Sequence, residues 1–212
     1  MNELWRLPNL LSLSRIAMTP VIGYFLWLDT PQATAVCVAL LFVAGITDGL
    51  DGLLARRMGM TSEIGKALDP IADKFLAAAL IVLLIFFREF PLWLAALILG
   101  RDLLILVAGL LLLQGRRIVI GSNITGKYTF TAIALLLGSY IIRFDFGVRL
   151  LIPITVALLI LSTVLYARVF QRVRDNRPPV EFADRPLYRV LRIGSLMIGI
   201  LILGWQLAER YL

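Results

Sequence analysis

Seven long apolar runs constrain this chain more than any other feature of its sequence. They cover residues 10–28, 33–54, 70–87, 91–113, 125–142, 150–169 and 193–207. A helix needs about 20 mostly apolar residues to cross a bilayer, and lipid leaves a single chain of this kind no other way to satisfy its backbone. The sequence therefore predicts an all-α integral membrane protein. We expect a bundle of six transmembrane helices, with the seventh run either a further span or a tilted or re-entrant helix.

Composition excludes both a soluble globular domain and a disordered chain. Apolar side chains make up 60% of the 212 residues and charged ones 17%, against about 45–50% and about 25% in soluble domains. Too little polar surface remains to cover a water-facing globule, and the same excess of apolar residues excludes disorder. The first run lacks a small-residue cleavage site, so we expect a retained span. We expect residues 1–170 to form the membrane domain, and 171–212 a basic connector with a hydrophobic C-terminal helix.

The basic residues predict the orientation of the chain. With the N-terminus inside, 16 of the 21 Lys and Arg residues fall in connections on the cytoplasmic side. The opposite side receives Arg88, Arg143, Arg149 and Arg210, and Arg101 falls within an apolar run. Cytoplasmic connections carry such an excess in membrane proteins. The Arg-rich stretch 168–192 then faces anionic lipid headgroups, and no nucleic-acid partner is predicted.

The chemistry open to the chain is limited by what its sequence lacks. It has no histidine and one cysteine, Cys37, which lies in an apolar run and is expected to pack there. An intramolecular disulfide, a cysteine-rich zinc site and a histidine-based catalytic triad are therefore excluded. A general base at neutral pH must be a carboxylate, a lysine, a tyrosine or water.

Four aspartates stand out because they lie at the cytoplasmic edge of apolar runs. Asp48 and Asp51 are spaced i, i+3, and Asp69 and Asp73 are spaced i, i+4, so each pair shares a helix face. An ionised aspartate in hydrocarbon costs about 2.5–3.5 kcal/mol, and clustered carboxylates repel one another. A divalent cation offsets both penalties, and oxygen ligands suit Mg²⁺, Mn²⁺ or Ca²⁺. The pattern predicts a metal site open to a phosphate-bearing substrate, although any single aspartate could instead be a helix cap or an interfacial charge.

The residues around the aspartates favour a phosphate ligand. Gly52 leaves room for a ligand to approach the backbone, and Arg56 offers a guanidinium suited to phosphate. Asp69 and Pro70 together predict the start of a helix, with Gly65 breaking the connection before it.

The spacing D-x2-D-G-x2-A-R-x8-G-x3-D-x3-D, read from Asp48 to Asp73, resembles the signature of the CDP-alcohol phosphatidyltransferases. The opening segment 7–15 is similar to the first-helix segment of that family, in which six spans are usual. The resemblance implies that an acceptor hydroxyl attacks the β-phosphorus of CDP-diacylglycerol and releases CMP. It implies two Mg²⁺ or Mn²⁺ ions per site. The implied roles are metal ligands at Asp48, Asp51, Asp69 and Asp73, the base at Asp73, and contacts to the cytidine diphosphate at Gly52, Arg56 and Ser62.

The acceptor alcohol is less constrained by the sequence. A phosphate-bearing acceptor needs basic side chains, and Arg101, Arg117 and Lys127 are the candidates. Arg101 could instead simply pair with Asp102, and Lys127 could be an ordinary interfacial anchor. The segment 122–129 is similar to bacterial phosphatidylglycerophosphate synthases but has Thr129 where a second lysine is expected. We favour glycerol 3-phosphate as the acceptor.

Two other functions stay open at this stage. Cardiolipin synthesis, with phosphatidylglycerol as the acceptor, fits the same resemblance. A cation transporter would also place carboxylates in the membrane, but it would spread them over several depths, whereas these four fall within 26 residues at one edge. A homodimer is one hypothesis for the oligomeric state. We expect an inner- or plasma-membrane protein of bacterial type, with the active site on the cytoplasmic side.

Overall fold

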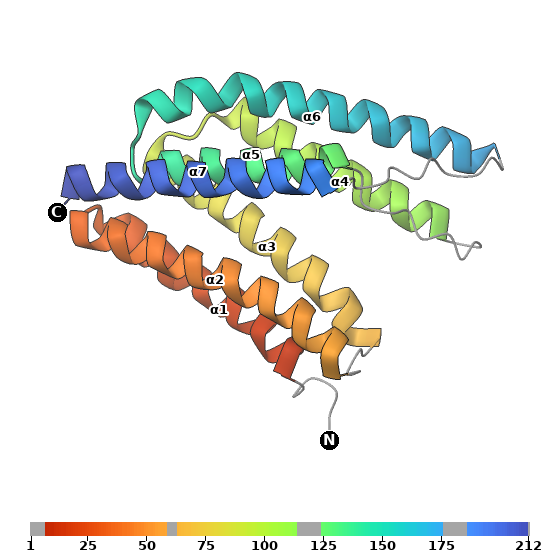
Figure 1. Cartoon of the computed structure of the whole chain (residues 1–212), viewed down its shortest axis with the longest axis horizontal. Coiled ribbons are helices and arrows are strands. Elements are labelled where there is room, and N and C mark those ends of the chain that lie inside the picture. Colours follow the sequence, from red (N-terminus) through yellow and green to blue (C-terminus); the bar gives the residue numbers. More distant parts are fainter. Residues whose placement is uncertain (1–6, 59–62, 114–123, 176–185, 212) are drawn as a thin grey trace. The chain divides into compact units, whose positions relative to one another are not determined.

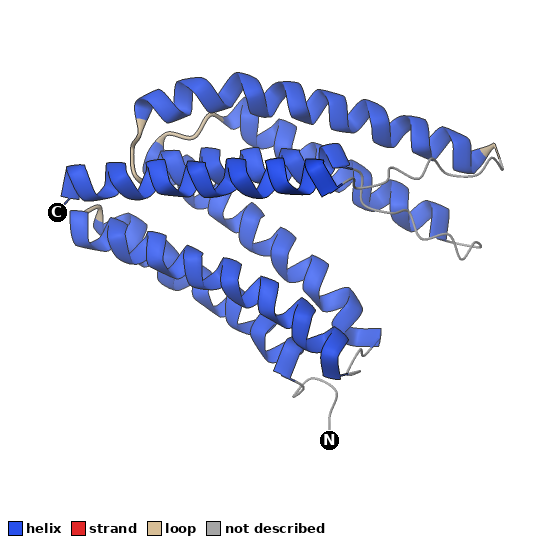
Figure 2. Cartoon of the chain, in the orientation of Figure 1, coloured by secondary structure: helices blue, strands red, loops and turns tan. Residues whose placement is uncertain are grey.

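The described part of the chain is helical throughout. The computed structural model describes residues 7–58, 63–113, 124–175 and 186–211. Within these ranges there are seven helices and no strand (Figures 1 and 2), which confirms the all-α class. The helices are α1 Leu7–Leu28, α2 Pro31–Met58, α3 Glu63–Arg88, α4 Leu92–Leu113, α5 Ile124–Ile141, α6 Asp145–Arg174 and α7 Pro186–Tyr211.

Each helix contains one of the seven apolar runs, but one predicted start is wrong. Helix α3 begins at Glu63, so Gly65, Asp69 and Pro70 lie inside the helix. A proline removes one backbone donor, and the surrounding helix can keep its other hydrogen bonds. Helices α1 and α6 likewise continue through Pro20 and Pro153.

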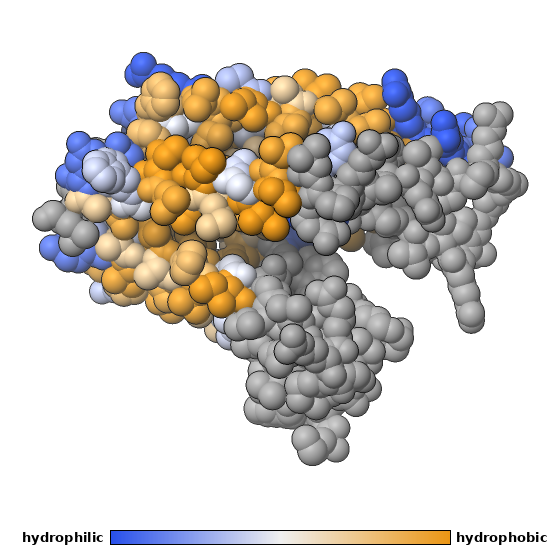
Figure 3. Space-filling model, viewed as in Figure 1, coloured by the Kyte–Doolittle hydropathy of each residue, from blue (hydrophilic) through white to orange (hydrophobic). Residues whose placement is uncertain are grey.

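Two described helices are long and apolar enough to cross a membrane. They comprise Asp145–Arg172 of α6 and Val190–Glu209 of α7, while the apolar stretches Leu13–Leu28 and Pro31–Thr47 are shorter. The prediction of six spans is therefore not confirmed by length and composition alone. Along α6 the surface is hydrophobic in the middle and hydrophilic at both ends, as expected for a helix that crosses a bilayer (Figure 3).

The chain divides into two compact units, which we describe separately. Unit 1 comprises Met1–Glu89 with Arg210–Leu212, and unit 2 comprises Phe90–Glu209. In unit 1, α1 packs against both α2 and α3. The Cys37 thiol on α2 donates to the Ile22 carbonyl of α1 at 3.5 Å, which confirms that this cysteine is a packing residue. A Cβ atom on Gly23 would lie 3.0 Å from Leu83 on α3. These two contacts show which residues of α1 lie beside which residues of α2 and α3.

A short turn joins α1 to α2 and is tied to the end of α3. Asp29 has a left-handed backbone with φ of 49°, and Thr30 caps α2 by accepting a hydrogen bond from the Ala33 N–H at 3.2 Å. Pro31 occupies the first helical position, where its missing donor costs nothing. Arg88, the last residue of α3, places Nη1 2.9 Å from the Asp29 carboxylate. The three helices of unit 1 are thus held together at this end.

In unit 2, α6 packs against α5 and α4. Helix α5 ends in a Schellman motif, in which the Phe144 N–H bonds to the Ser139 carbonyl at 2.8 Å and the Arg143 N–H to the Tyr140 carbonyl at 3.2 Å. Arg143 takes the left-handed position with φ of 55°. The chain reverses within three residues to begin α6.

Helix α7 runs alongside α5 in the same direction. Three contacts join the two helices in the order Tyr188 to Tyr128, Gly199 to Leu135 and Leu203 to Gly138. Residue numbers rise together in both helices, so the helices are parallel. The seventh run is therefore a continuous helix packed along α5 rather than a short hairpin.

Candidate active site

The four aspartates lie on α2 and α3, the two helices that pack against α1. Asp48 and Asp51 belong to α2, and Asp69 and Asp73 belong to α3. Each pair therefore lies on one continuous helix, as its spacing predicts. The structure describes the backbone at these positions, and their side chains lie outside the described atoms, as do those of Gly52 and Arg56. Ser62 and Arg117 lie outside the described residues altogether.

The aspartates share one level of unit 1. Helix α2 starts beside Asp29, and α3 ends at Arg88, which is paired with Asp29. At 1.5 Å per residue, Asp48 lies about 26 Å from that end and Asp73 about 23 Å. Both pairs are therefore carried to the far end of unit 1, where α2 ends and α3 begins.

The donor set of this cluster fits a hard divalent cation. Carboxylate oxygens are the ligands that Mg²⁺ and Mn²⁺ prefer, and the chain has no histidine that could replace them. Among the side chains that the structure describes, which do not include those of the four aspartates, no group of three His, Cys, Asp or Glu residues lies together.

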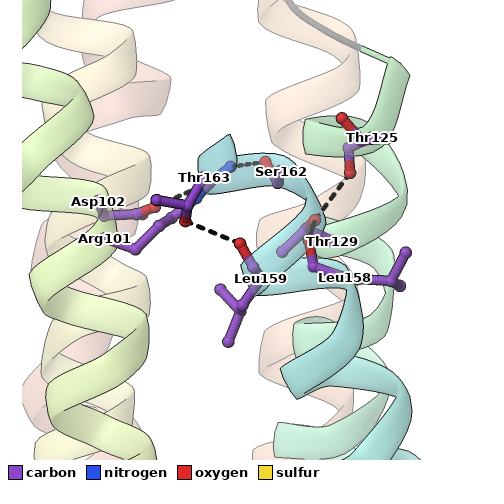
Figure 4. A network of polar contacts seen from close by, with 8 residues as sticks. All are labelled: Arg101, Asp102, Thr125, Thr129, Leu158, Leu159, Ser162 and Thr163. Atoms are coloured by element: carbon purple, nitrogen blue, oxygen red, sulfur yellow. Dashed lines mark hydrogen bonds and ion pairs between the residues drawn. The ribbon is translucent and has the colours of Figure 1, made fainter. Parts of the chain in front are cut away.

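A second polar centre lies in unit 2 around Arg101 of α4. Its Nη1 pairs with Asp102 at 2.5 Å, and its Nη2 donates to Ser162 Oγ of α6 at 2.6 Å (Figure 4). The guanidinium carbon also lies 5.6 Å from the centre of the Tyr166 ring, close enough for a cation–π contact. The pairing with Asp102 confirms one of the two interpretations of Arg101. This pairing does not use all the hydrogen-bond donors of the guanidinium, because its buried Nε has no hydrogen-bond partner among the described atoms.

Gly126, the residue before Lys127, lies close to Arg101 and Tyr166. A Cβ on Gly126 would lie 3.2 Å from the Tyr166 hydroxyl and 3.7 Å from Arg101 Nη2. A side chain at this position would crowd both groups, so glycine allows the start of α5 to approach them. Two of the three candidate acceptor residues, Arg101 and Lys127, therefore lie on adjoining helices of one unit.

Thr129 does not substitute for the expected second lysine. Its side chain is fully buried, and its hydroxyl lies 2.7 Å from the Thr125 carbonyl and 3.2 Å from the Leu158 carbonyl of α6 (Figure 4). The hydroxyl joins α5 to α6 and is directed at backbone acceptors. The position therefore serves packing in this chain.

The sequence interpretation missed Ser162 and Tyr166. Both are polar residues, four apart in an apolar run, and polar groups inside a span usually mark a site or a pairing partner. That signal could have singled out the two α6 residues. The contact of Gly126 with Arg101 and Tyr166 could not be predicted, because it depends on the approach of α5 to α4 and α6.

Comparison with known proteins identifies the family. The family model for CDP-alcohol phosphatidyltransferase matches residues 5–168. This stretch includes the four aspartates, Arg101 and Lys127. The match defines a class of transferases, and the chain belongs to the CDP-alcohol phosphatidyltransferase family.

Three of the relatives carry three different names. A CDP-diacylglycerol--glycerol-3-phosphate 3-phosphatidyltransferase of Aquifex aeolicus is 37% identical over 161 residues, 74% of this chain and 88% of the relative. A probable phosphatidylglycerophosphate synthase of Mycobacterium tuberculosis is 35% identical over 162 residues, 75% of this chain and 77% of the relative. A cardiolipin synthase and mitochondrial hydrolase fusion protein of Schizosaccharomyces pombe is 42% identical over 107 residues, half of this chain. That match spans only 18% of the length of the fusion protein.

Proposed function

We propose that this protein transfers the phosphatidyl group of CDP-diacylglycerol to glycerol 3-phosphate and releases CMP. The observation that carries the proposal is the family match over residues 5–168. Relatives named for this reaction support it, because they align with about three quarters of the chain. The reaction would serve phospholipid biosynthesis.

The carboxylates of α2 and α3 would hold the divalent ions. Asp48, Asp51, Asp69 and Asp73 would supply oxygen ligands from two helices that both pack against α1. Two Mg²⁺ or Mn²⁺ ions, when bound, would neutralise charge on the diphosphate. Gly52, Arg56 and Ser62 would contact the cytidine diphosphate.

The chemical step needs one proton transfer and one displacement. Asp73 would accept the proton of the acceptor hydroxyl, whose oxygen then forms a bond to the β-phosphorus. The bond from that phosphorus to the bridging oxygen breaks, and CMP leaves with the electron pair. No covalent enzyme intermediate is required, because positioning and charge stabilisation account for most catalysis of phosphoryl transfer.

The acceptor phosphate would be held in unit 2. Arg101 has donor capacity beyond its pairs with Asp102 and Ser162, and Lys127 follows the glycine that adjoins it. Cationic side chains would offset the charge of an incoming dianion. Arg117 completes the proposed set.

Cardiolipin synthesis is the second candidate, favoured by one observation. Thr129 is buried between α5 and α6 and supplies no second cation beside Lys127. Phosphatidylglycerol, which brings a less charged phosphate than glycerol 3-phosphate, would need fewer cations. The similarity to the fission yeast fusion protein agrees with this candidate over half of the chain.

The proposed membrane topology follows from charge, aromatic residues and the direction of α7. The excess of basic residues supports a cytoplasmic N-terminus and cytoplasmic carboxylates. Trp27, Trp93 and Trp205 are exposed near helix ends that this orientation places on the opposite side, where interfacial tryptophans are common. Because α7 is parallel to α5, it would form a further span that carries the C-terminus away from the cytoplasm.

The decisive experiment assays purified protein with CDP-diacylglycerol, Mg²⁺ or Mn²⁺, and each acceptor in turn. We expect CMP release and a phosphatidylglycerophosphate product with glycerol 3-phosphate, and loss of both in EDTA or with Asp48→Asn. Turnover with phosphatidylglycerol alone would select the second candidate. CMP release at the full rate in EDTA would refute the role of the carboxylates. Size measurement of the purified protein tests the predicted homodimer.

A further inference from the structure

Arg15 is a charged residue buried in the helical core of unit 1. Its exposed fraction is 1%, the lowest among the charged residues that the structure describes as buried. It shares one stripe of α1 with Thr19, Ile22, Gly23 and Leu26, all of which are buried. Ile22 contacts α2, and Gly23 contacts α3. Arg15 therefore faces the two helices that carry the aspartates.

The packing contacts show which residues of α2 and α3 lie at the same height along the helices as Arg15. Since Ile22 lies beside Cys37 of the antiparallel α2, Arg15 is level with Ala44, and Asp48 is four residues further along. Gly23 lies beside Leu83 of the parallel α3, so Arg15 is level with Phe75. Asp73 is two residues from that level. The backbone offsets are about 6 Å to Asp48 and about 3 Å to Asp73.

The general lean of helical side chains would reduce the remaining offset. Side chains on a helix lean toward its N-terminus, and the N-terminal end of α1 is the end at which the aspartates lie. The other described acids of unit 1, Asp29 and Glu89, lie about 21 Å away along the helices in the opposite direction. The aspartate level is thus where the charge of Arg15 acts.

The charge balance of the proposed site suggests what a positive charge at Arg15 would do. Four ionised aspartates and two divalent ions cancel, so the two negative charges of a bound CDP-lipid diphosphate would need two positive side chains, of which the proposed Arg56 contact supplies one. A buried charge is stable only when it is compensated. We infer that Arg15 is a positioning residue, a buried cation level with the metal-binding carboxylates that favours binding of the donor diphosphate. This inference rests on the proposed function and extends it to a residue outside the aspartate motif.

The inference predicts two effects of opposite sign. Removing a positive charge beside the carboxylates should strengthen Mn²⁺ binding in the absence of donor, and it should weaken binding of the CDP-lipid. A unit charge about 7 Å away, at an effective dielectric constant of about 20, changes the binding constant of another unit charge by roughly ten- to fiftyfold. A purely structural role would instead weaken both together.

The experiment compares the wild-type protein with Arg15→Met, Arg15→Lys and the uncharged control Thr19→Val in lipid nanodiscs. Mn²⁺ affinity is measured by electron paramagnetic resonance without donor, KM for CDP-diacylglycerol by CMP release, and folding by thermal unfolding. We expect Arg15→Met to bind Mn²⁺ about tenfold more tightly and to raise KM at least tenfold. Arg15→Lys and Thr19→Val should stay within about threefold of wild type, since neither changes the charge.

The outcomes separate this inference from the proposed function. A wild-type protein that binds neither Mn²⁺ nor CDP-diacylglycerol would refute the proposed function and the role of Arg15 with it. A wild-type protein that binds both, with Arg15→Met equal to it or weaker in both affinities, would overturn this inference alone. If Arg15→Met does not fold, Arg15→Lys decides: a folded lysine variant that loses both affinities overturns the inference, because its charge is retained.

Discussion

Substitution of Asp29 should reveal how much the end of unit 1 depends on one ion pair. The Arg88 side chain is 2% exposed and the Asp29 side chain 44% exposed, with 2.9 Å between the paired atoms. Exposed pairs contribute about 0–1 kcal/mol, and breaking a fully buried pair costs about 3–5 kcal/mol. A pair with one partner buried lies between these limits, so Asp29→Asn, which removes the charge, should cost about 1–2 kcal/mol.

Two further substitutions separate the charge from the backbone. Asp29 has φ of 49°, in the left-handed region. A Cβ atom there causes steric strain of about 1–2 kcal/mol, which glycine avoids. Asp29→Ala should therefore be less stable than Asp29→Gly by about 1 kcal/mol, although both lose the ion pair. Thermal unfolding in detergent measures the series, and each kcal/mol corresponds to about 2–4 °C for a chain of this size.

Glu89 provides the matched control. It also has a left-handed backbone, with φ of 55°, and it is exposed at the end of α3. Glu89→Gly should raise stability by about 0.5–1 kcal/mol through backbone relief alone. If Asp29→Asn were as stable as the wild type, the ion pair would contribute nothing. If alanine and glycine at position 29 were equal, the backbone argument would be wrong.

Three predictions concern the proposed activity. Asp73→Asn should lower kcat by about 10²–10⁴-fold, as expected for a positioned base, and an unchanged kcat would reassign that role. Lys127→Ala should raise KM for glycerol 3-phosphate by a factor equivalent to about 1.5–3 kcal/mol, and KM for CDP-diacylglycerol much less; equal changes in both constants would remove Lys127 from the acceptor site. A reporter fused after Arg57 should read as cytoplasmic and one fused after Tyr211 as external, and the reverse pattern would invert the proposed topology.

The helices were predictable because lipid-facing segments must be long and apolar. The run 10–28 predicted α1 to within three residues, and 91–113 predicted α4 to within one. Errors arose where polar residues continue a helix beyond its apolar part. Helix α7 extends from Pro186 to Tyr211, well outside the run 193–207, because polar residues such as Arg192 and Glu209 can extend a helix into the interface.

The site was predictable only where its residues are close in sequence. The four aspartates lie within 26 residues, and their helical spacing pointed to a shared face. The contact of Arg101 with Ser162 joins residues 61 apart, and periodicity carries no information on which helices pack together. The level of Arg15 beside the aspartates was hidden for the same reason, since it depends on the packing of α1 against α2 and α3.

The tight turn at Asp29 fixes α1 and α2 to each other at one end, so a small rotation at the turn moves the opposite end of the hairpin. Helices joined by two residues and clamped by Arg88 cannot separate there, whereas a rotation of about 5° about the turn displaces Asp48 by about 2 Å at a radius of about 26 Å. An error of about 1 Å in a reacting group can cost about a hundredfold in rate. If the proposed function holds, a loosened ion pair at Asp29 should therefore shift the carboxylates and slow catalysis, although no proposed metal ligand is itself substituted.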